Sequence, residues 1–360
     1  MSTRDNTILF LGATGFLGSQ FLTLLNRAGH KFHIVSLARQ LSDEKKAQLK
    51  EIYPNMSFVE ACLDDLDVIS REAAKVKYVV NAASSDHPQS IQAVLDGLEK
   101  NSAANPGSPP LYLHVSGLCI TGDNARGEFK EEKDIPRYTD TDFTVDSVPF
   151  ENPHVNCDSQ IMRAYQRKEN PIRTIITFPA WIYGLGEGYR KSSGGVRVFV
   201  EANRSLNRSG YWGKGENSFN NVHIADCSRA LLMIFEAALQ GKADEGPQGY
   251  YFISSDEPTI PWKDYSATIG DLMFAKGKYT TPGAQPYPPA VADAFGDYGW
   301  RLLGGNIRVH AERLKKLGWE PVMSKQHSMM ECLPEEVEMA FHDLQPVNSI
   351  LKPTEASAST

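Results

Sequence analysis

The sequence predicts an α/β protein with a Rossmann-type doubly wound parallel sheet and a smaller C-terminal α/β substrate lobe. First, an apolar run at about 7–11 leads directly into Gly12-x-x-Gly15-x-x-Gly18, and the next residues have helical spacing. Second, strand-like runs alternate with helical stretches over the first half of the chain, a pattern typical of parallel sheets covered by helices on both faces. Third, 360 residues suffice for a large core in one unit with two lobes.

The first half of the chain is expected to supply the sheet. Strands are predicted at about 7–11, 32–37, 56–61, 77–82, 110–116 and 172–178, and helices at about 15–28, 42–52, 65–75, 88–100 and 153–168. Residues 122–152 are polar and acidic without periodicity, which predicts a long loop, and loops of that length are usually functional or mobile. These elements define an NAD(P)-binding domain over residues 1–180, to which the chain returns near 215–255.

Residues 181–342 are expected to form the substrate-binding lobe. Helices are predicted at about 224–240, 262–275, 308–317 and 326–342, with a strand near 249–254. The tail, 343–360, is rich in Ser, Thr, Ala and Pro and is expected to be disordered. An aromatic group in this half suits either an apolar substrate pocket or simple packing: Trp181, Tyr183, Tyr189, Tyr211, Trp212 and Phe219.

Charge and composition narrow the choice of partner. The net charge is −7 and no block of Lys or Arg occurs, which argues against nucleic acid or an acidic membrane as the main partner. No apolar run approaches the length of a membrane span. The five cysteines are scattered, so neither a disulfide framework nor a metal site is indicated. We expect a cytoplasmic protein with a small-molecule substrate and leave a homodimer open.

The glycine turn is the strongest functional signal. A strand that enters a glycine-rich turn and then a helix brings free backbone N–H groups and a positive dipole end to a pyrophosphate. The alternative is a glycine-rich turn without a ligand. The turn residues expected at the cofactor are Gly12, Thr14, Gly15, Phe16, Leu17 and Gly18.

Arg39 favours NADP(H) over NAD(H). Dinucleotide sites that use NAD carry an acidic residue about 20 residues beyond the glycines, where it binds the ribose 2′-hydroxyl. Here the second predicted strand is followed by Arg39 and Gln40, and no carboxylate occurs before Asp43. An arginine pairs with a 2′-phosphate, which a carboxylate would repel. The alternative is that Arg39 is only a solvated surface residue.

Seven segments occur in a recognisable order: Gly12-Ala13-Thr14-Gly15-Phe16-Leu17-Gly18, Asp64-Asp65, Asn81-Ala82-Ala83, Val115-Ser116-Gly117-Leu118-Cys119-Ile120-Thr121-Gly122, Phe178-Pro179-Ala180-Trp181-Ile182-Tyr183-Gly184, Asn221-Val222-His223-Ile224-Ala225-Asp226 and Arg313-Leu314-Lys315-Lys316-Leu317-Gly318-Trp319. From about residue 7 to 340 the chain thereby resembles the extended short-chain dehydrogenase/reductase superfamily, particularly its atypical, NmrA-like or epimerase/dehydratase-like branch. The resemblance implies that Asp64 lies near the adenine and that Asn81, Ala82 and Ala83 border the cofactor. It also implies that Ser116 hydrogen-bonds a substrate oxygen, whereas the alternative is a strand-end serine bonded to backbone.

The sequence departs from this superfamily at the catalytic pair. The family uses Tyr-x-x-x-Lys on one helix face, yet none of the fourteen tyrosines here has Lys four residues on. His154 and Asp158 stand where the resemblance places Tyr and Lys, and at this spacing we expect Asp158 to orient the imidazole as an acid–base dyad. The alternative is a helix-end histidine beside a solvated aspartate. Asp86 and His87 are rival acids, and Tyr183 is a further candidate in the pocket.

Three functions remain open at this stage. The leading hypothesis is an enzyme of small-molecule, including secondary, metabolism that performs redox-neutral acid–base chemistry on a largely apolar oxygenated substrate: epimerisation, isomerisation, dehydration or cyclisation. The second is an NADP(H)-dependent carbonyl reductase in which Ser116 is assisted by a surrogate donor, His154 or Tyr183. The third is a non-enzymatic regulator that senses NADP, which should tolerate loss of Ser116 and His154.

Overall fold

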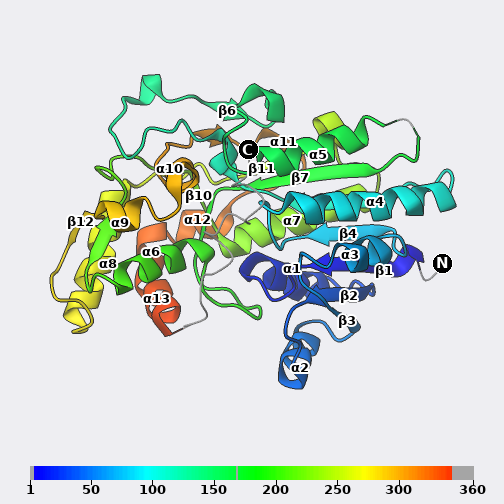
Figure 1. Ribbon diagram of the computed structural model, residues 1–360, viewed down its shortest axis with the longest axis horizontal. Coiled ribbons are helices and arrows are strands. Elements are labelled where there is room, and N and C mark those ends of the chain that lie inside the picture. Colours follow the sequence, from blue (N-terminus) through cyan, green and yellow to red (C-terminus); the bar gives the residue numbers. More distant parts are fainter. Residues whose placement is uncertain (1–3, 168, 343–360) are drawn as a thin grey trace.

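A seven-stranded, wholly parallel sheet forms the centre of the molecule in the computed structural model, which describes residues 4–167 and 169–342 (Figure 1). Its strand order is β11-β7-β5-β4-β1-β2-β3. The strands are β1 (Thr7–Leu11), β2 (His33–Ala38), β3 (Met56–Glu60), β4 (Tyr78–Asn81), β5 (Leu111–Val115), β7 (Arg173–Pro179) and β11 (Tyr250–Ile253). The chain winds outward from β1 to β3 and then returns across β1 to β4, which is the reversal of a doubly wound sheet. The predicted fold class is confirmed.

Helices cover both faces of this sheet, because right-handed crossovers in opposite directions place their helices on opposite sides. On one face α1 packs against α7, and on the other α3 packs against α4, which contacts α5. The helices associated with the sheet are α1 (Phe16–Arg27), α2 (Asp43–Ile52), α3 (Leu66–Ala73), α4 (Pro88–Ala104), α5 (Val155–Tyr165) and α7 (Ile224–Leu239). The apolar strands that read as continuous runs are buried between these layers; Ile8, Leu9, Phe10 and Leu11 are fully buried.

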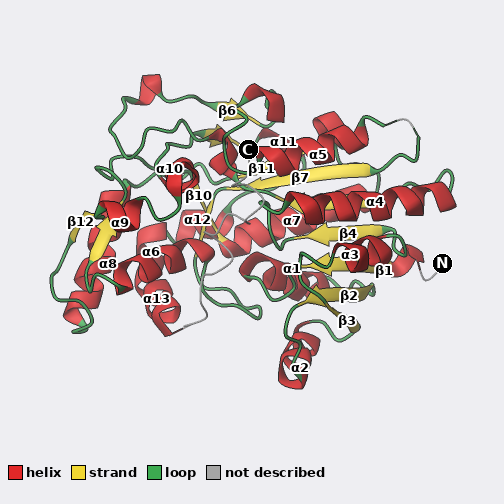
Figure 2. Ribbon diagram, in the orientation of Figure 1, coloured by secondary structure: helices red, strands yellow, loops and turns green. Residues whose placement is uncertain are grey.

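Further helices and three short parallel strand pairs lie outside the seven-stranded sheet, mostly in the second half of the chain (Figure 2). The pairs are β8 (Trp181–Tyr183) with β10 (Asn221–His223), β9 (Ser209–Tyr211) with β12 (Ala284–Pro286), and β6 (Tyr138–Thr139) with β13 (Val309–His310). The helices are α6 (Gly194–Arg204), α8 (Trp262–Ala275), α9 (Pro289–Ala292), α10 (Gly296–Leu303), α11 (Glu312–Lys316), α12 (Val322–Gln326) and α13 (Met329–His342). The tail expected to be disordered lies outside the described residues.

The aromatic group of this half is mainly packing. Trp181 lies 4.5 Å from Trp262 between ring centroids, and Trp212 and Phe219 are 2% and 3% exposed. Their rings meet mostly edge to face, the arrangement that aromatic quadrupoles favour in cores. The expected pocket wall is therefore largely a hydrophobic core. Of the helices in the described part of the chain, none is both long and apolar enough to cross a membrane.

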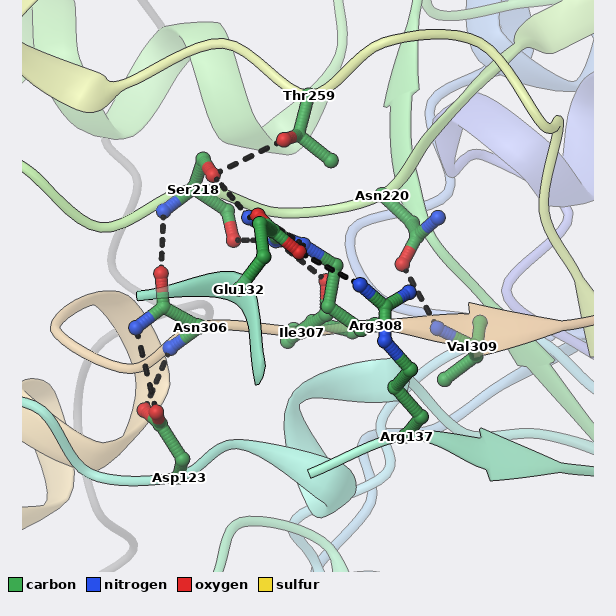
Figure 3. Close-up of polar contacts among 10 residues, drawn as sticks. All are labelled: Asp123, Glu132, Arg137, Ser218, Asn220, Thr259, Asn306, Ile307, Arg308 and Val309. Carbon is green, nitrogen blue, oxygen red and sulfur yellow. Dashed lines mark hydrogen bonds and ion pairs between the residues drawn. The ribbon is translucent and has the colours of Figure 1, made fainter. Parts of the chain in front are cut away.

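The long segment 122–152 is irregular for most of its length but is fastened to the C-terminal half (Figure 3). The buried guanidinium of Arg308 donates to both carboxylate oxygens of Glu132, at 2.7 to 3.2 Å, and to the backbone oxygen and hydroxyl of Ser218. Asn306 donates to Asp123 through its backbone and its side chain. We call these contacts the Arg308 latch. They hold a segment that sequence alone describes as a loop.

Candidate active site

The glycine turn has the shape that a dinucleotide pyrophosphate requires. Gly12 has a φ of +93°, and a Cβ there would overlap the carbonyl oxygen of Ala82 at the end of β4. A Cβ on Gly18 would overlap the carbonyl oxygen of Gly12. Helix α1 begins at Phe16, and its N-cap Gly15 provides no side-chain cap. The first N–H groups of α1 are thus available to an anion, and the turn fits the pyrophosphate of a dinucleotide.

The other predicted cofactor residues lie around the same edge of the sheet. Thr14 belongs to the turn, and Arg39 is exposed directly after the carboxyl end of β2. Asp64 is largely exposed and accepts from Nε2 of His87 at 3.0 Å, so the residue expected near the adenine contacts one of the two rival acids. The Asn81 amide supports the end of β4: its oxygen accepts from the backbone N–H of Ala83, at 3.1 Å.

Ser116 and Asp158 meet where β5 ends. The Ser116 hydroxyl donates to Oδ2 of Asp158 at 2.7 Å, with both side chains buried. Asp158 lies on α5, which contacts β7 and α4, and it is fully buried rather than solvated. Burial raises the pKa of Asp158 to about 7, although the Ser116 hydrogen bond and the nearby His154 charge favour the ionised form. A carboxyl group in this position exchanges protons near neutral pH.

The expected His154–Asp158 dyad is not formed. His154 precedes the first residue of α5 and has a φ of +73°, so the spacing of four residues does not place the two side chains on one helix face. Its partner is instead Asp86, which follows β4: Nδ1 of His154 and Oδ1 of Asp86 lie 2.9 Å apart. The left-handed backbone of a non-glycine residue is a strained conformation of the kind that gathers at functional sites.

His154 and Asp86 form an ion pair. Burial alone would lower the pKa of His154, but the Asp86 charge and hydrogen bond outweigh it and hold that pKa well above its ordinary value. Burial would likewise raise the pKa of Asp86, and the His154 charge and hydrogen bond reverse this and keep it lowered. His154 is therefore an imidazolium at neutral pH. The Asp86 charge stabilises the imidazolium more than the neutral imidazole, so His154 carries a proton that it can donate.

Two residues at this pair were not found by sequence reasoning. Tyr298 of α10 hydrogen-bonds Asp86, and burial raises its pKa, so the phenol is protonated and donates to the carboxylate. The thiol of Cys119 contacts the His154 imidazole and adds to the upward shift of its pKa. Cys119 lies in the Val115–Gly122 segment of the resemblance, where it was assigned no role, whereas Tyr298 lies outside every quoted segment and reaches the site from a helix far along the chain. The packing of α10 against the 3₁₀ turn Leu118–Thr121 brings it there.

The hydroxyl of Tyr183 is bound to the backbone of the C-terminal region and is not free to transfer a proton to a substrate. Tyr183 is 1% exposed, and its hydroxyl donates to the backbone oxygen of His327 at 2.7 Å. Burial raises the pKa of Tyr183, so its proton is held by the backbone of the C-terminal region. Its ring contacts His223 edge to face. These contacts account for Tyr183 as a structural residue, and we do not assign it a chemical role.

Comparison with known proteins gives the family. The model of the NAD dependent epimerase/dehydratase family matches residues 8–246. The chain belongs to this family. The resemblance to extended short-chain dehydrogenases/reductases is confirmed. The oxidase ucsJ of an Acremonium species is 26% identical over 332 residues, covering 88% of this chain and 92% of that protein. A dTDP-4-dehydro-6-deoxy-D-allose reductase of Streptomyces bikiniensis is 23% identical over 247 residues, covering 64% and 72%.

Solved structures share the fold of this family member. The dTDP-glucose 4,6-dehydratase DesIV of Streptomyces venezuelae, with NAD and TYD bound, superposes with a TM-score of 0.63 at 17% identity, covering 94% of this chain and 97% of that one. A UDP-glucose 4-epimerase of Thermotoga maritima with UDP-glucose gives 0.61 at 16% identity, covering 94% and 100%. At these identities the likeness establishes the architecture alone.

Proposed function

We propose that the protein is an NADP(H)-binding enzyme that performs redox-neutral acid–base chemistry on a small, largely apolar oxygenated metabolite, including the metabolites of secondary metabolism. The observation that carries the proposal is a pair of carboxyl groups, Asp86 and Asp158, held near the carboxyl ends of β4 and β5 in opposite electrostatic settings. One is kept ionised by His154, and the other exchanges its proton near neutral pH. Such divergent environments mark acid–base assignments in enzymes.

Each residue has a defined task in this proposal. Ser116 binds a substrate oxygen, and Asp158 behind it takes up or returns a proton. The His154 imidazolium donates a proton to substrate, and Asp86, fixed by Tyr298, stabilises that charged form. A bound dinucleotide would supply a hydride donor or acceptor at the same edge of the sheet. Arg39 supports the choice of NADP(H), because its guanidinium suits a 2′-phosphate and no carboxylate follows β2 at that point.

An NADPH-dependent carbonyl reductase is the second candidate. The observation in its favour is that His154 stands at the family's tyrosine position as a charged proton donor, so it is able to protonate a carbonyl oxygen. One relative is named an oxidase and another a reductase. Against it stands the missing lysine: Asp158, at that position, is a buried acid that hydrogen-bonds Ser116.

An isotope experiment decides between the two. A panel of cyclic and aryl hydroxyketones is incubated with the enzyme and NADPH in D₂O, and in parallel with C4-deuterated NADPH in H₂O. The redox-neutral proposal predicts deuterium at the carbon beside the carbonyl in D₂O, with no loss of NADPH absorbance. Deuterium transfer from the cofactor with stoichiometric NADPH loss would establish the reductase instead.

Variants test the residues assigned. His154→Ala should slow the isotope exchange by about 10²–10⁴-fold, the usual contribution of a general acid or base. His310→Ala is the control, because that imidazole is about half exposed and pairs with Asp256, which has no part in the candidate site. If no member of the panel exchanges or is reduced, the enzymatic proposal fails and the NADP-sensing regulator takes its place.

A further inference from the structure

We propose that Ser116 offers its substrate a lone pair and not a proton, so the site selects a substrate hydroxyl at Ser116 and relays that proton to Asp158. This inference depends on the proposed function only in assuming that a substrate binds beside Ser116. In the relay, the substrate O–H bond breaks as a proton moves to Oγ of Ser116. The Ser116 proton passes to Oδ2 of Asp158, leaving a substrate alkoxide and a neutral carboxyl group. No oxidant is needed, and the reverse transfer restores both groups.

The inference depends on the direction of a buried hydrogen-bond chain behind Ser116. The oxygen of the Asn81 amide accepts from Ala83, which fixes the amide orientation, and its nitrogen donates to the Tyr112 hydroxyl at 3.1 Å. The Tyr112 proton is then directed to Nδ1 of His114, at 3.2 Å. A neutral imidazole that accepts at Nδ1 carries its proton on Nε2. His114 therefore presents an N–H at its other end.

That N–H faces Asp158. Nε2 of His114 lies 3.7 Å from Oδ1 of Asp158, both side chains are fully buried, and neither atom has a hydrogen bond to another of the described residues. Burial lowers the pKa of His114 to about 3, so the imidazole stays neutral and keeps this tautomer. One Asp158 oxygen thus faces a donor on β5 and the other accepts the Ser116 proton. The hydroxyl hydrogen of Ser116 is engaged, and its lone pairs are what a substrate meets.

The direction of the hydrogen bond between Ser116 and Asp158 reverses with pH. When Asp158 takes up a proton, its carboxyl O–H donates to Ser116, and the Ser116 hydrogen is released toward a carbonyl. The groups that face or act on Asp158 come from several elements: His114 and Tyr112 of β5, Ser116 directly after it, His154 and Cys157 at α5, Asp86 after β4, and Tyr250 of β11. Among them only Ser116 and His114 direct a hydrogen at the carboxylate. His154 and Asp86 act on it through their charge, and Tyr112 acts through His114. Burial raises the pKa of Cys157 and of Tyr250, so both stay protonated and uncharged. Hydroxyl selection is therefore a property of neutral and higher pH.

The test reads the direction of the Ser116 hydrogen bond without any substrate. The protein is labelled with ¹³C at aspartate side-chain carboxyls, titrated by NMR, and the Asp158 signal is assigned by its absence in Asp158→Asn. If Ser116 donates to the carboxylate, Ser116→Ala removes a bond to the charged form and raises the Asp158 titration midpoint, by about 1–2 pH units. If Ser116 instead accepts from the carboxyl group, the same substitution lowers the midpoint.

Two variants keep the result interpretable. Ser116→Thr retains the hydroxyl and should leave the midpoint near that of the unaltered protein, whereas Ser159→Ala, at the neighbouring helix position, should not move it. A lowered or unchanged midpoint in Ser116→Ala overturns the inference. Because the titration needs no substrate, this outcome is separate from failure of the isotope experiment, which concerns the proposed function.

Discussion

Replacing Asp86 with asparagine removes the ion pair with His154 and so measures its contribution to the free energy of unfolding. The Asp86 side chain is 36% exposed and that of His154 is 7% exposed. A hydrogen bond between charged groups contributes about 1.5–3 kcal/mol, and solvent screening at the partly exposed carboxylate reduces this to about 1–2 kcal/mol. We therefore expect Asp86→Asn to lower the free energy of unfolding by about 1–2 kcal/mol near pH 6.

The pH dependence of that loss identifies the pair. The folded-state pKa of His154 is raised, so its contribution to stability is complete below its ordinary value of 6.5 and disappears as pH rises through the folded value. The pKa of Asp86 is lowered, so its contribution is present above 3.8 and disappears as pH falls through the folded value. The difference between the two proteins is thus largest from about pH 4 to 6.5 and shrinks in alkaline solution.

Urea unfolding at a series of pH values measures this difference. Asp96→Asn serves as the matched control, since that carboxylate is exposed on α4 and contacts Gln92 of the same helix. Its effect should be small and independent of pH. A deficit in Asp86→Asn that is constant with pH, or that grows as the solution becomes alkaline, would refute the assignment of His154 as an imidazolium held by Asp86.

Three further substitutions test other parts of the structure. Arg39→Ala should weaken NADP binding roughly tenfold or more in calorimetry and leave NAD binding nearly unchanged, because one charged pair to the 2′-phosphate is lost; equal losses for both would reject the NADP preference. Gly12→Ala should abolish binding of either dinucleotide and destabilise the fold more than Gly29→Ala, which shares the positive φ but has open space around it. Arg308→Met should speed proteolytic cleavage within residues 122–152, whereas Arg137→Met, which removes only the half-exposed second partner of Glu132, should not.

Local chemistry explains why the nucleotide half could be predicted from sequence. The predicted helix at 15–28 is Phe16–Arg27 in the structure, and the predicted strand at 172–178 is Arg173–Pro179. Both follow from patterns of neighbouring residues: glycines that admit a tight turn, and an apolar run that only a covered strand buries. The predicted helix at 308–317 failed in its first part, because Val309 and His310 pair with β6 and only Glu312–Lys316 is helical.

The candidate site shows where sequence reasoning stops. Ser116 and Asp158 were both named from sequence, but their contact with each other was not, because spacing along the chain says nothing about a strand end and a helix that meet across the sheet. The His154 pairing was wrong since a single left-handed residue rotated the imidazole away from the helix face. His114 lies in a segment predicted as an ordinary strand, and Tyr298 lies between two predicted helices, in a segment to which no element was assigned. Their roles arise only from tertiary packing.

Strand β11, which covers the edge of β7, is synthesised long after β7 itself. Strand β7 ends at Pro179, yet the strand that pairs with its outer edge, β11, begins at Tyr250. Until that segment emerges from the ribosome, the edge of β7 presents unpaired backbone groups beside Ile175 and Ile176, which are buried in the finished protein. Such an edge templates association with other chains. The first 180 residues, although they contain the nucleotide cradle, are therefore expected to aggregate when expressed alone, and a soluble fragment must extend past Ile253.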